Sequence, residues 1–445
     1  MIIRYSAPGP WWARGVHLLR LLPQATVVAE AAKWDLDVRV ERRRQALQIS
    51  VAGAGVSQQT IIPTDKGAFL STLFQVLSTI QGAPISPWGI LTGVRPGKVA
   101  FRLLQDLGQD AAREELCRTW LVCPDKARLL IAAVVNGYPL LSQRGLSIYI
   151  SVPFCPSRCH YCSFVSLPLE RWQGTLKTYV GRAAQELMDL LTACRQYQIP
   201  VNSIYVGGGT PTALDPGLLE ELLAPATHPG CEFTVESGRP DTLTAEHLRV
   251  MKDLGVTRIS VNSQYPRDET LAAIGRQHSA EQFYTALEMA AHSGIQVINS
   301  DLIVGLPGQT PEDFAQGVSR LVDSGVQNIT IHALALKRGA VTQQQYLDPR
   351  IAQEIAQVAY TRLAEHDLIP YYLYRQKNIA SNLENVGFAM PNTLCYYNIA
   401  SIAESEPVLG VGAGAVSKLV RHSAIETLNN PHASNASLTS TSPYW

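Results

Sequence analysis

Residues 147–164 read SIYISVPFCPSRCHYCSF and decide how the rest of the chain is interpreted. The first six residues are mostly apolar and β-branched or aromatic, which predicts a buried strand. Cys155, Cys159 and Cys162 follow directly in the spacing CxxxCxxC. Three thiols on one short loop after a strand predict a metal centre at the carboxyl end of that strand.

This spacing favours an iron–sulfur cluster. Three thiolates can hold three irons of a [4Fe–4S] cube and leave the fourth iron open, where the amino and carboxylate groups of S-adenosylmethionine (SAM) can bind. Tyr161, just before the last cysteine, is placed to pack beside the adenine. A structural zinc site is the alternative, but zinc takes four ligands, and only His160 could supply the fourth within the loop.

From Ser147 onward, short apolar strands alternate with amphipathic helical stretches. The expected strands are SIYISV, SIYVGG, EFTVES, RISVNS, VINSDLIVG and NITIHALAL. Six strand–helix units predict a parallel sheet, and six are too few for a complete eight-fold barrel. We therefore expect a partial (β/α)6 barrel in an α/β protein, with a doubly wound sheet as the alternative.

Polar residues lie at the ends of these strands. The run GGGTPT, which includes Gly208, Gly209 and Thr210, follows the second strand, and its glycines allow the backbone to approach a ligand closely. The other polar residues are Glu236, Gln264, Arg276 and Asp301. Because catalytic groups of β/α barrels gather at the carboxyl ends of strands, we expect all of them to face one mouth with the cysteine loop.

The pattern predicts four segments. Residues 1–140 form an N-terminal α+β accessory domain, with strands at 35–44 and 46–53, a helix near 67–80, a Gly/Pro-rich loop at 86–98 and a helix at 110–138. Residues 147–340 form the barrel, and residues 341–428 form a C-terminal segment that covers the substrate. The small, polar residues 429–445 are expected to be a disordered tail.

The composition limits the partners and the cellular location that we expect for this protein. The 445 residues carry 37 basic and 37 acidic side chains, a balance that indicates neither nucleic acid nor a membrane surface as partner. Five of the eight cysteines are scattered, unlike a secreted disulfide framework. The N-terminus lacks the apolar core of a signal peptide, and no apolar run is long enough to span a membrane. We therefore expect a cytoplasmic protein.

Together these motifs resemble the radical SAM superfamily, in particular the oxygen-independent coproporphyrinogen III oxidase (dehydrogenase) family. The resemblance implies a [4Fe–4S] cluster and SAM as cofactors. It implies that Glu236 and Gln264 contact the SAM ribose, and that Arg276 and Asp301 contact its methionine and ribose region. The full set of implied SAM-binding residues is Tyr149, Tyr161, Gly208, Gly209, Thr210, Glu236, Gln264, Arg276, Asp301 and Ala335.

Further segments, among them SPWGILTGVRPGK, VESGRPDTLT and GVGAGAVSK, resemble the second-type bacterial branch, which has an N-terminal extension. The implied reaction is oxygen-independent oxidative decarboxylation of coproporphyrinogen III to protoporphyrinogen IX in haem biosynthesis. The implied electron donor is of the flavodoxin or ferredoxin type, and the protein is expected to be a monomer. Basic side chains should hold the substrate's propionates; the candidates are Lys337, Arg338, Arg375 and Lys377.

One position departs from the family. The decarboxylase branch has a fourth cysteine two residues after the triplet, where this chain has Phe164. Related haem chaperones also lack that cysteine, so a haem- or porphyrin-binding chaperone with a radical SAM fold is the alternative function. His332, Tyr374 and Tyr396 would then be the candidate haem contacts. SAM-dependent modification of RNA is a third class, for which the chain shows no basic, aromatic-rich module.

Overall fold

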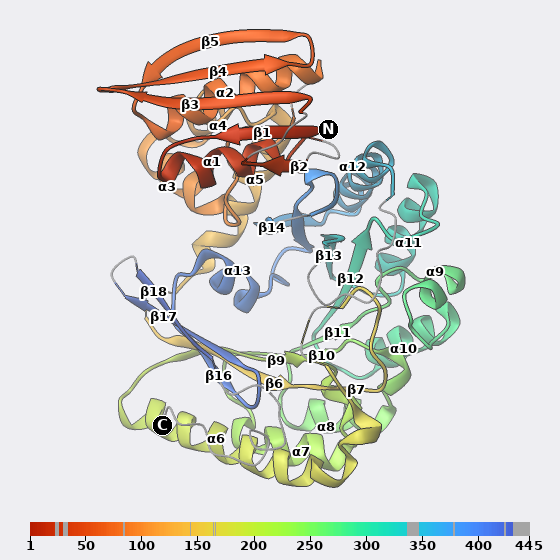
Figure 1. Ribbon diagram of the computed structural model, residues 1–445. Coiled ribbons are helices and arrows are strands. Elements are labelled where there is room, and N and C mark those ends of the chain that lie inside the picture. The colour runs from red at the N-terminus through yellow and green to blue at the C-terminus, as the bar shows by residue number, and fades with distance from the viewer. Residues whose placement is uncertain are drawn as a thin grey trace. The chain divides into compact units, whose positions relative to one another are not determined.

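The computed structural model describes residues 1–22, 26–29, 34–82, 85–142, 144–162, 164, 166–335, 347–376, 379–421 and 424–429. Two compact units make up the chain, Met1–Ala132 and Ala133–Trp445 (Figure 1). Lys337, Arg338 and Lys377 lie outside the described residues, as does the predicted tail from residue 430 onward. No helix within the described part of the chain is long and apolar enough to cross a membrane.

The first unit is an α+β module around a five-stranded sheet with the order β2-β1-β3-β4-β5. Its strands are β1 (Ile2–Ser6), β2 (Thr26–Val28), β3 (Leu36–Arg43), β4 (Ala46–Gly53) and β5 (Val56–Pro63). Its helices are α1 (Pro10–Leu19), α2 (Lys66–Gln81), α3 (Gly97–Leu107), α4 (Gln109–Arg118) and the first turns of α5 (Pro124–Gly137). The apolar positions of β3 and β4 are buried in one core cluster with Phe69 and Leu73 of α2.

The stretch 110–138 forms two helices, so the prediction of one continuous helix is wrong. Helix α4 ends at Arg118, and α5 begins at Pro124. Proline has no amide hydrogen to donate and is therefore favoured in the first turn of a helix and disfavoured inside one. The intervening residues 119–123 include Leu121, which has a positive φ of 57°. A helix cannot continue through that left-handed conformation.

Six parallel strands form the centre of the second unit, as predicted. They are β6 (Leu146–Val152), β9 (Val201–Gly208), β10 (Glu232–Ser237), β11 (Arg258–Val261), β12 (Val297–Val304) and β13 (Asn328–Ala333). Each pairs in parallel with the next one along the chain. A doubly wound sheet would reverse its strand order at a switch point, so the doubly wound alternative is wrong and the partial barrel is confirmed.

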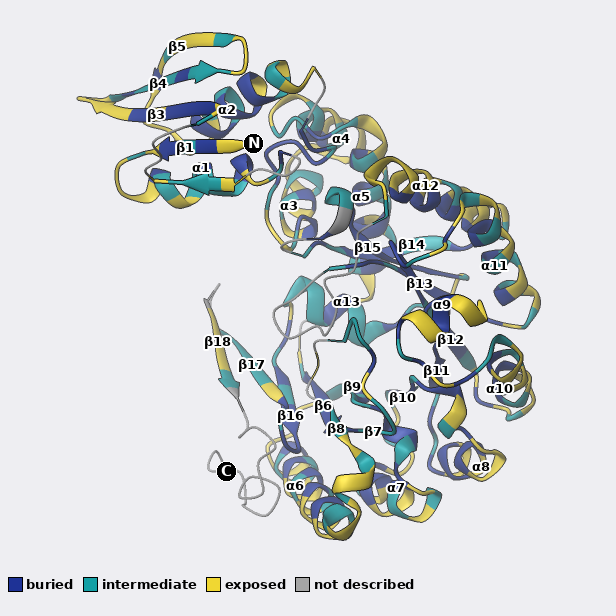
Figure 2. Cartoon of the chain, turned by 45° about the vertical axis from the view of Figure 1, so that its right-hand side comes forward, coloured by how far each residue is buried: buried dark blue, intermediate teal, exposed yellow. Residues whose placement is uncertain are grey.

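Helices between these strands lie on the outer side of the sheet, with buried faces inward and exposed faces outward (Figure 2). They are α6 (Leu176–Gln196), α7 (Pro216–Leu223), α8 (Ala245–Asp253), α9 (Asp268–Ala273), α10 (Ala280–His292) and α11 (Pro311–Asp323). Asp215, Thr244, Ser279 and Thr310 cap the N-termini of α7, α8, α10 and α11 by accepting a backbone N–H. Such caps satisfy amides that the first helical turn leaves without a partner.

Strands from the C-terminal part of the chain extend the sheet to eleven strands. At one edge, β16 (Val408–Val411) pairs in parallel with β6 and leads into β17 (Val416–Arg421) and β18 (Ala424–Asn429). At the other edge, β15 (Asn385–Ala389) pairs antiparallel with β13 and with β14 (Ile369–Tyr374). Helices α12 (Pro349–Glu365) and α13 (Tyr396–Ala403) complete this part. A separate ribbon pairs β7 (Phe154–Cys155) with β8 (Leu167–Pro168).

Candidate cofactor site

The cysteine loop lies at the carboxyl end of β6. It is anchored to the end of α9, because the backbone N–H of His160 donates to the carbonyl of Ile274 over 2.9 Å and its Nδ1 lies 3.1 Å from the carbonyl of Ala273. Cys155, Cys159 and Cys162 all line one cavity of about 420 Å³. That volume is within the range of sites for small molecules and cofactors.

The glycine run packs directly against the cysteine loop. The N–H groups of Gly209 and Thr210 donate to the carbonyls of Val152 and Phe154, each over 2.7 Å. A Cβ on Gly209 would lie 2.5 Å from the carbonyl oxygen of Phe154, which only glycine avoids. The glycines therefore bring β9 against the cluster loop, and these two amides are not directed at a ligand.

The predicted strand-end residues meet at this cavity. Its lining includes Tyr149, Tyr161, Gly208, Gly209, Thr210, Glu236, Gln264, Arg276, Asp301 and Ala335. The geometry thus brings the candidate SAM residues together with the cysteines, although their contacts with SAM stay a prediction. Gln264 has a positive φ of 71°, a strained conformation for a non-glycine residue that is often found at functional sites.

Glu236 is one of the two carboxyl groups that line the cavity. Its Oε1 accepts a hydrogen bond of 2.6 Å from the hydroxyl of Tyr205. Burial raises the pKa of Glu236 to about 7, although the hydrogen bond from Tyr205 opposes this shift. Close to neutral pH, Glu236 can therefore be either a hydrogen-bond donor or an ionised acceptor.

Asp301 of β12 has three polar neighbours: Asn299 on the same strand, Asn262 just after β11 and His332 on β13. The side-chain amides of Asn262 and Asn299 each donate to its carboxylate over 3.1 Å, and Nε2 of His332 lies 3.8 Å away. Burial alone would raise the pKa of Asp301, but His332 and Asn299 outweigh it and lower that pKa below its usual range. Asp301 is therefore an ionised acceptor that points into the cavity.

Arg276 connects the strand ends to the cysteine loop. Its Nη1 donates to the carbonyls of Gly238 and Asn262 over 3.0 and 2.5 Å, and its Nη2 donates to the hydroxyl of Tyr161 over 3.0 Å. Its Nε is buried without a hydrogen-bond partner among the described residues. An unpartnered, buried cationic donor fits an anionic ligand such as a carboxylate.

Other predicted residues are placed differently. Arg375 is absent from the cavity lining, and its buried guanidinium is near Glu384. Burial lowers the pKa of Arg375 to about 10, so its role as a substrate contact stays a prediction that the geometry does not favour. Tyr396 lies outside the lining and donates to Glu406 over 2.7 Å, whereas His332 and Tyr374 do line the cavity. Phe164 lines it too and is 65% exposed.

Several lining residues were not predicted. They include Tyr205, Arg239, Asn262, Asn299, Tyr372 and Tyr397. Asn299 lies within β12 and Asn262 directly follows β11. Such residues could have been noticed because a polar group in a buried strand needs a partner. Tyr372 and Tyr397 come from β14 and the start of α13, where the strand–helix alternation has already ended.

Comparison with known proteins gives the family. Residues 149–321 match the family model of the radical SAM superfamily. The oxygen-independent coproporphyrinogen-III oxidase-like protein HemZ of Bacillus subtilis (strain 168) is 34% identical over 425 residues, which is 88% of this chain and 84% of that protein. The chain is a radical SAM protein of the coproporphyrinogen III oxidase-like family.

Two other similarities are relevant to this radical SAM protein. The heme chaperone HemW of B. subtilis (strain 168) is 29% identical over 283 residues, 60% of this chain and 70% of the chaperone. The solved structure of coproporphyrinogen III oxidase (HemN) from Escherichia coli has a TM-score of 0.47 at 20% identity, over 62% of this chain and 64% of that one. The relatives in sequence thus include one protein named as oxidase-like and one named as a heme chaperone.

Radical SAM proteins use a [4Fe–4S] cluster and SAM, and these are the cofactors of this chain. The lining fits both groups. Three thiols supply the ligands for three irons, and buried polar atoms without partners in the described lining offer contacts to a polar ligand: Nε of Arg276, Nε and Nη1 of Arg258, Oγ1 of Thr234 and Nδ2 of Asn385. No three His, Cys, Asp or Glu side chains of the described residues converge on a single metal ion; in a cube, each thiolate binds a different iron.

The pKa of Glu236 predicts a pH dependence of SAM binding. If the ionised carboxylate accepts hydrogen bonds from the ribose hydroxyls, affinity should rise as pH rises through about 7. When only the ionised form binds, the dissociation constant should fall about tenfold from one pH unit below this pKa to one above it. Anaerobic equilibrium dialysis with labelled SAM measures this. Glu236→Gln should flatten the profile, and an equally steep profile in that variant would contradict the assignment.

Proposed function

We propose that the protein is an oxidoreductase that converts coproporphyrinogen III to protoporphyrinogen IX without oxygen. In this reaction two propionate side chains each lose CO2 and two hydrogens to become vinyl groups. The observation that carries the proposal is that the cluster ligands, the candidate SAM residues and a group of tyrosines line one cavity. We call these tyrosines the aromatic wall; they are Tyr149, Tyr205, Tyr372, Tyr374 and Tyr397. The relative named as a coproporphyrinogen-III oxidase-like protein, similar over 88% of this chain, supports the same substrate class.

The aromatic wall gives the cavity a second chemical character. Tyr205 and Tyr397 stack with ring centroids 4.4 Å apart, and Tyr149 stacks on both at 6.3 and 6.2 Å. Tyr372 and Tyr374 form a further stacked pair at 6.4 Å. Flat aromatic surfaces with polar tips suit a large, partly apolar ring system that carries polar substituents. This is the character of a porphyrinogen.

The C-terminal segment supplies much of this wall. Tyr397, Asn398, Ser401 and Ile402 of α13 line the cavity, as do Tyr372 and Tyr374 of β14. We propose that residues 341–428 cover the substrate and limit the access of water to it. Excluding water protects a reactive centre from side reactions.

The proposed mechanism divides the work between cofactors and protein. When bound, the reduced cluster and SAM would supply the capacity to remove a hydrogen atom from a propionate side chain. Cys155, Cys159 and Cys162 would hold the cluster, while Glu236 and Asp301 would orient the SAM ribose. One electron must enter for each SAM consumed, and another must leave with each CO2 released. We propose a flavodoxin- or ferredoxin-type protein as the donor.

The alternative function is binding and transfer of haem. Two observations favour it: Phe164 stands where the decarboxylase branch has a fourth cysteine, and a heme chaperone is 29% identical over 60% of this chain. His332 lines the cavity with its Nδ1 3.4 Å from the hydroxyl of Tyr374. Imidazole and phenolate side chains are both known haem ligands.

Anaerobic incubation with coproporphyrinogen III distinguishes the two functions. With SAM and a chemical reductant present, we expect mass spectrometry to show a product that has lost two CO2 and four hydrogens. Omitting SAM or admitting oxygen should abolish the product. Robust SAM cleavage without this product, together with tight haem binding that His332→Gln weakens, would overturn the oxidase proposal in favour of the carrier.

A further inference from the structure

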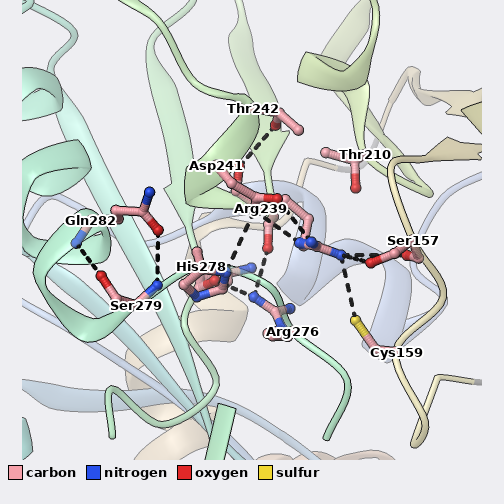
Figure 3. Close-up of polar contacts among 12 residues, drawn as sticks. Ser157, Cys159, Thr210, Arg239, Asp241, Thr242, Arg276, His278, Ser279 and Gln282 are labelled. Carbon is pink, nitrogen blue, oxygen red and sulfur yellow. Dashed lines mark hydrogen bonds and ion pairs between the residues drawn. The ribbon is translucent and has the colours of Figure 1, made fainter. Parts of the chain in front are cut away.

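Arg239 reaches from the end of β10 to the cysteine loop. Its side chain is only 3% exposed and lines the cavity. Its Nη1 lies 3.0 Å from the hydroxyl and 3.4 Å from the carbonyl of Ser157, and 4.0 Å from Sγ of Cys159. Figure 3 shows the guanidinium directed at both residues of the loop. Arg239 is thus a buried cation that donates to a predicted cluster ligand.

The orientation of Arg239 is set by Asp241. The carboxylate accepts from Nε over 3.0 Å and from Nη2 over 2.8 Å, a two-point contact that fixes the plane of the guanidinium. His278 also contacts the carboxylate of Asp241, with its Nδ1 3.4 Å from Oδ1 (Figure 3). With two of its nitrogens held by Asp241, Arg239 has Nη1 left to direct at Ser157 and Cys159.

We propose that Arg239 is a positioning residue for the iron–sulfur cluster that holds the ligand loop and raises the cluster's reduction potential through its N–H donor to the sulfur of Cys159. Reduction adds negative charge to the cluster, and hydrogen bonds to its sulfurs together with nearby positive charge stabilise that charge. Asp241 partly offsets the effect, because its carboxylate lies on the other side of the guanidinium. This role is independent of the substrate, so it can hold or fail separately from the proposed oxidase function.

The charges of this pair predict shifts of opposite sign. Arg239→Met removes the donor and the positive charge at similar length, so the potential should fall. Asp241→Asn keeps the shape but removes the balancing negative charge, so the potential should rise. A residue that only supported the fold would not produce two shifts in opposite directions. Arg239→Lys keeps the charge without the planar fork and should lie between wild type and Arg239→Met.

The test is a redox titration of the anaerobically reconstituted full chain, followed by electron paramagnetic resonance of the reduced cluster. At a fixed potential, the ratio of reduced to oxidised cluster in Arg239→Met should fall about tenfold, which corresponds to about 59 mV for one electron. Iron content per chain is measured on the same samples. Arg267→Met is the matched control, because Arg267 is an exposed arginine that pairs with Asp313. Its potential should equal that of wild type.

The test uses two variants, Arg239→Met and Asp241→Asn, so that it still gives a result if the first does not assemble a cluster. If Arg239→Met holds its cluster and its potential does not fall, the proposal is overturned. If that variant fails to assemble a cluster, Asp241→Asn decides: a raised potential supports the proposal, and an unchanged or lowered potential overturns it.

Discussion

Replacing Cys155, Cys159 and Cys162 together by alanine should reduce cluster iron from about four atoms per chain to none. Four described cysteines line the cavity, but only these three share one loop, and each of them would bind a different iron. Cys395 precedes α13 and donates to Glu232. Burial raises the pKa of Cys155 to about 11, so the metal itself must favour the thiolate. Without these three sulfurs, the described lining keeps one cysteine, Cys395, and a single thiolate does not supply ligands for three irons. Iron assay and visible absorbance after anaerobic reconstitution measure the loss.

A matched control is available in the same chain. Cys117, Cys123 and Cys231 are free and of intermediate exposure, and none of them lines the cavity. Replacing these three by alanine removes as many thiols and should leave the iron content at the wild-type value. Retention of about four irons by the first triple variant would contradict the cluster assignment. So would a colourless wild-type protein that holds one zinc per chain.

Sequence patterns predicted the barrel well because one physical effect, the burial of apolar side chains, dominates the formation of its strands. Strands β10 to β13 are buried at most of their positions, and most of their apolar side chains lie in the core. Burial of that kind overrides other local preferences. The sequence also holds local signals for helix starts, since Ser279 and Gln282 form a capping box at α10. Such signals are local, and they do not depend on which distant segment packs against them.

The edges of the sheet could not be predicted in this way. Strand β16 is the short segment Val408–Val411, and it is defined by its parallel pairing with β6, more than 250 residues earlier in the sequence. Strand β15 pairs antiparallel with both β13 and β14, so it does not continue the series of parallel strands. Pairings between distant segments are determined by tertiary context, which single-sequence patterns do not contain.

The candidate site was predictable where residues carry a recognisable motif. The cysteine triplet and the polar strand ends reach one cavity, as the convergence of parallel strand ends requires. Arg239 and Asn262 were missed because each acts through a neighbour: one contacts the cysteine loop, and the other supports Asp301. Residues that support others have no spacing rule of their own. Only the folded geometry shows them.

Changing Asp301 to asparagine should weaken SAM binding at least tenfold. In this radical SAM protein, Asp301 is expected to contact the methionine and ribose region of SAM. A hydrogen bond to a charged group contributes about 1.5–3 kcal/mol, and each 1.4 kcal/mol is a factor of ten in affinity. Asparagine has the same size, and Asn262 and Asn299 already surround the site, so the loss reflects charge and acceptor capacity more than packing.

Equilibrium dialysis of the reconstituted protein with labelled SAM measures this loss, and the yield of 5′-deoxyadenosine under reducing conditions should fall with it. Asp323→Asn is the control, since Asp323 is exposed at the end of α11 and does not line the cavity. Iron content distinguishes loss of SAM binding from loss of the cluster. Because Asp301 is not a cluster ligand, its variant should keep about four irons and lose SAM affinity. A variant that binds SAM as tightly as wild type would remove Asp301 from the SAM site and leave it as the partner of His332.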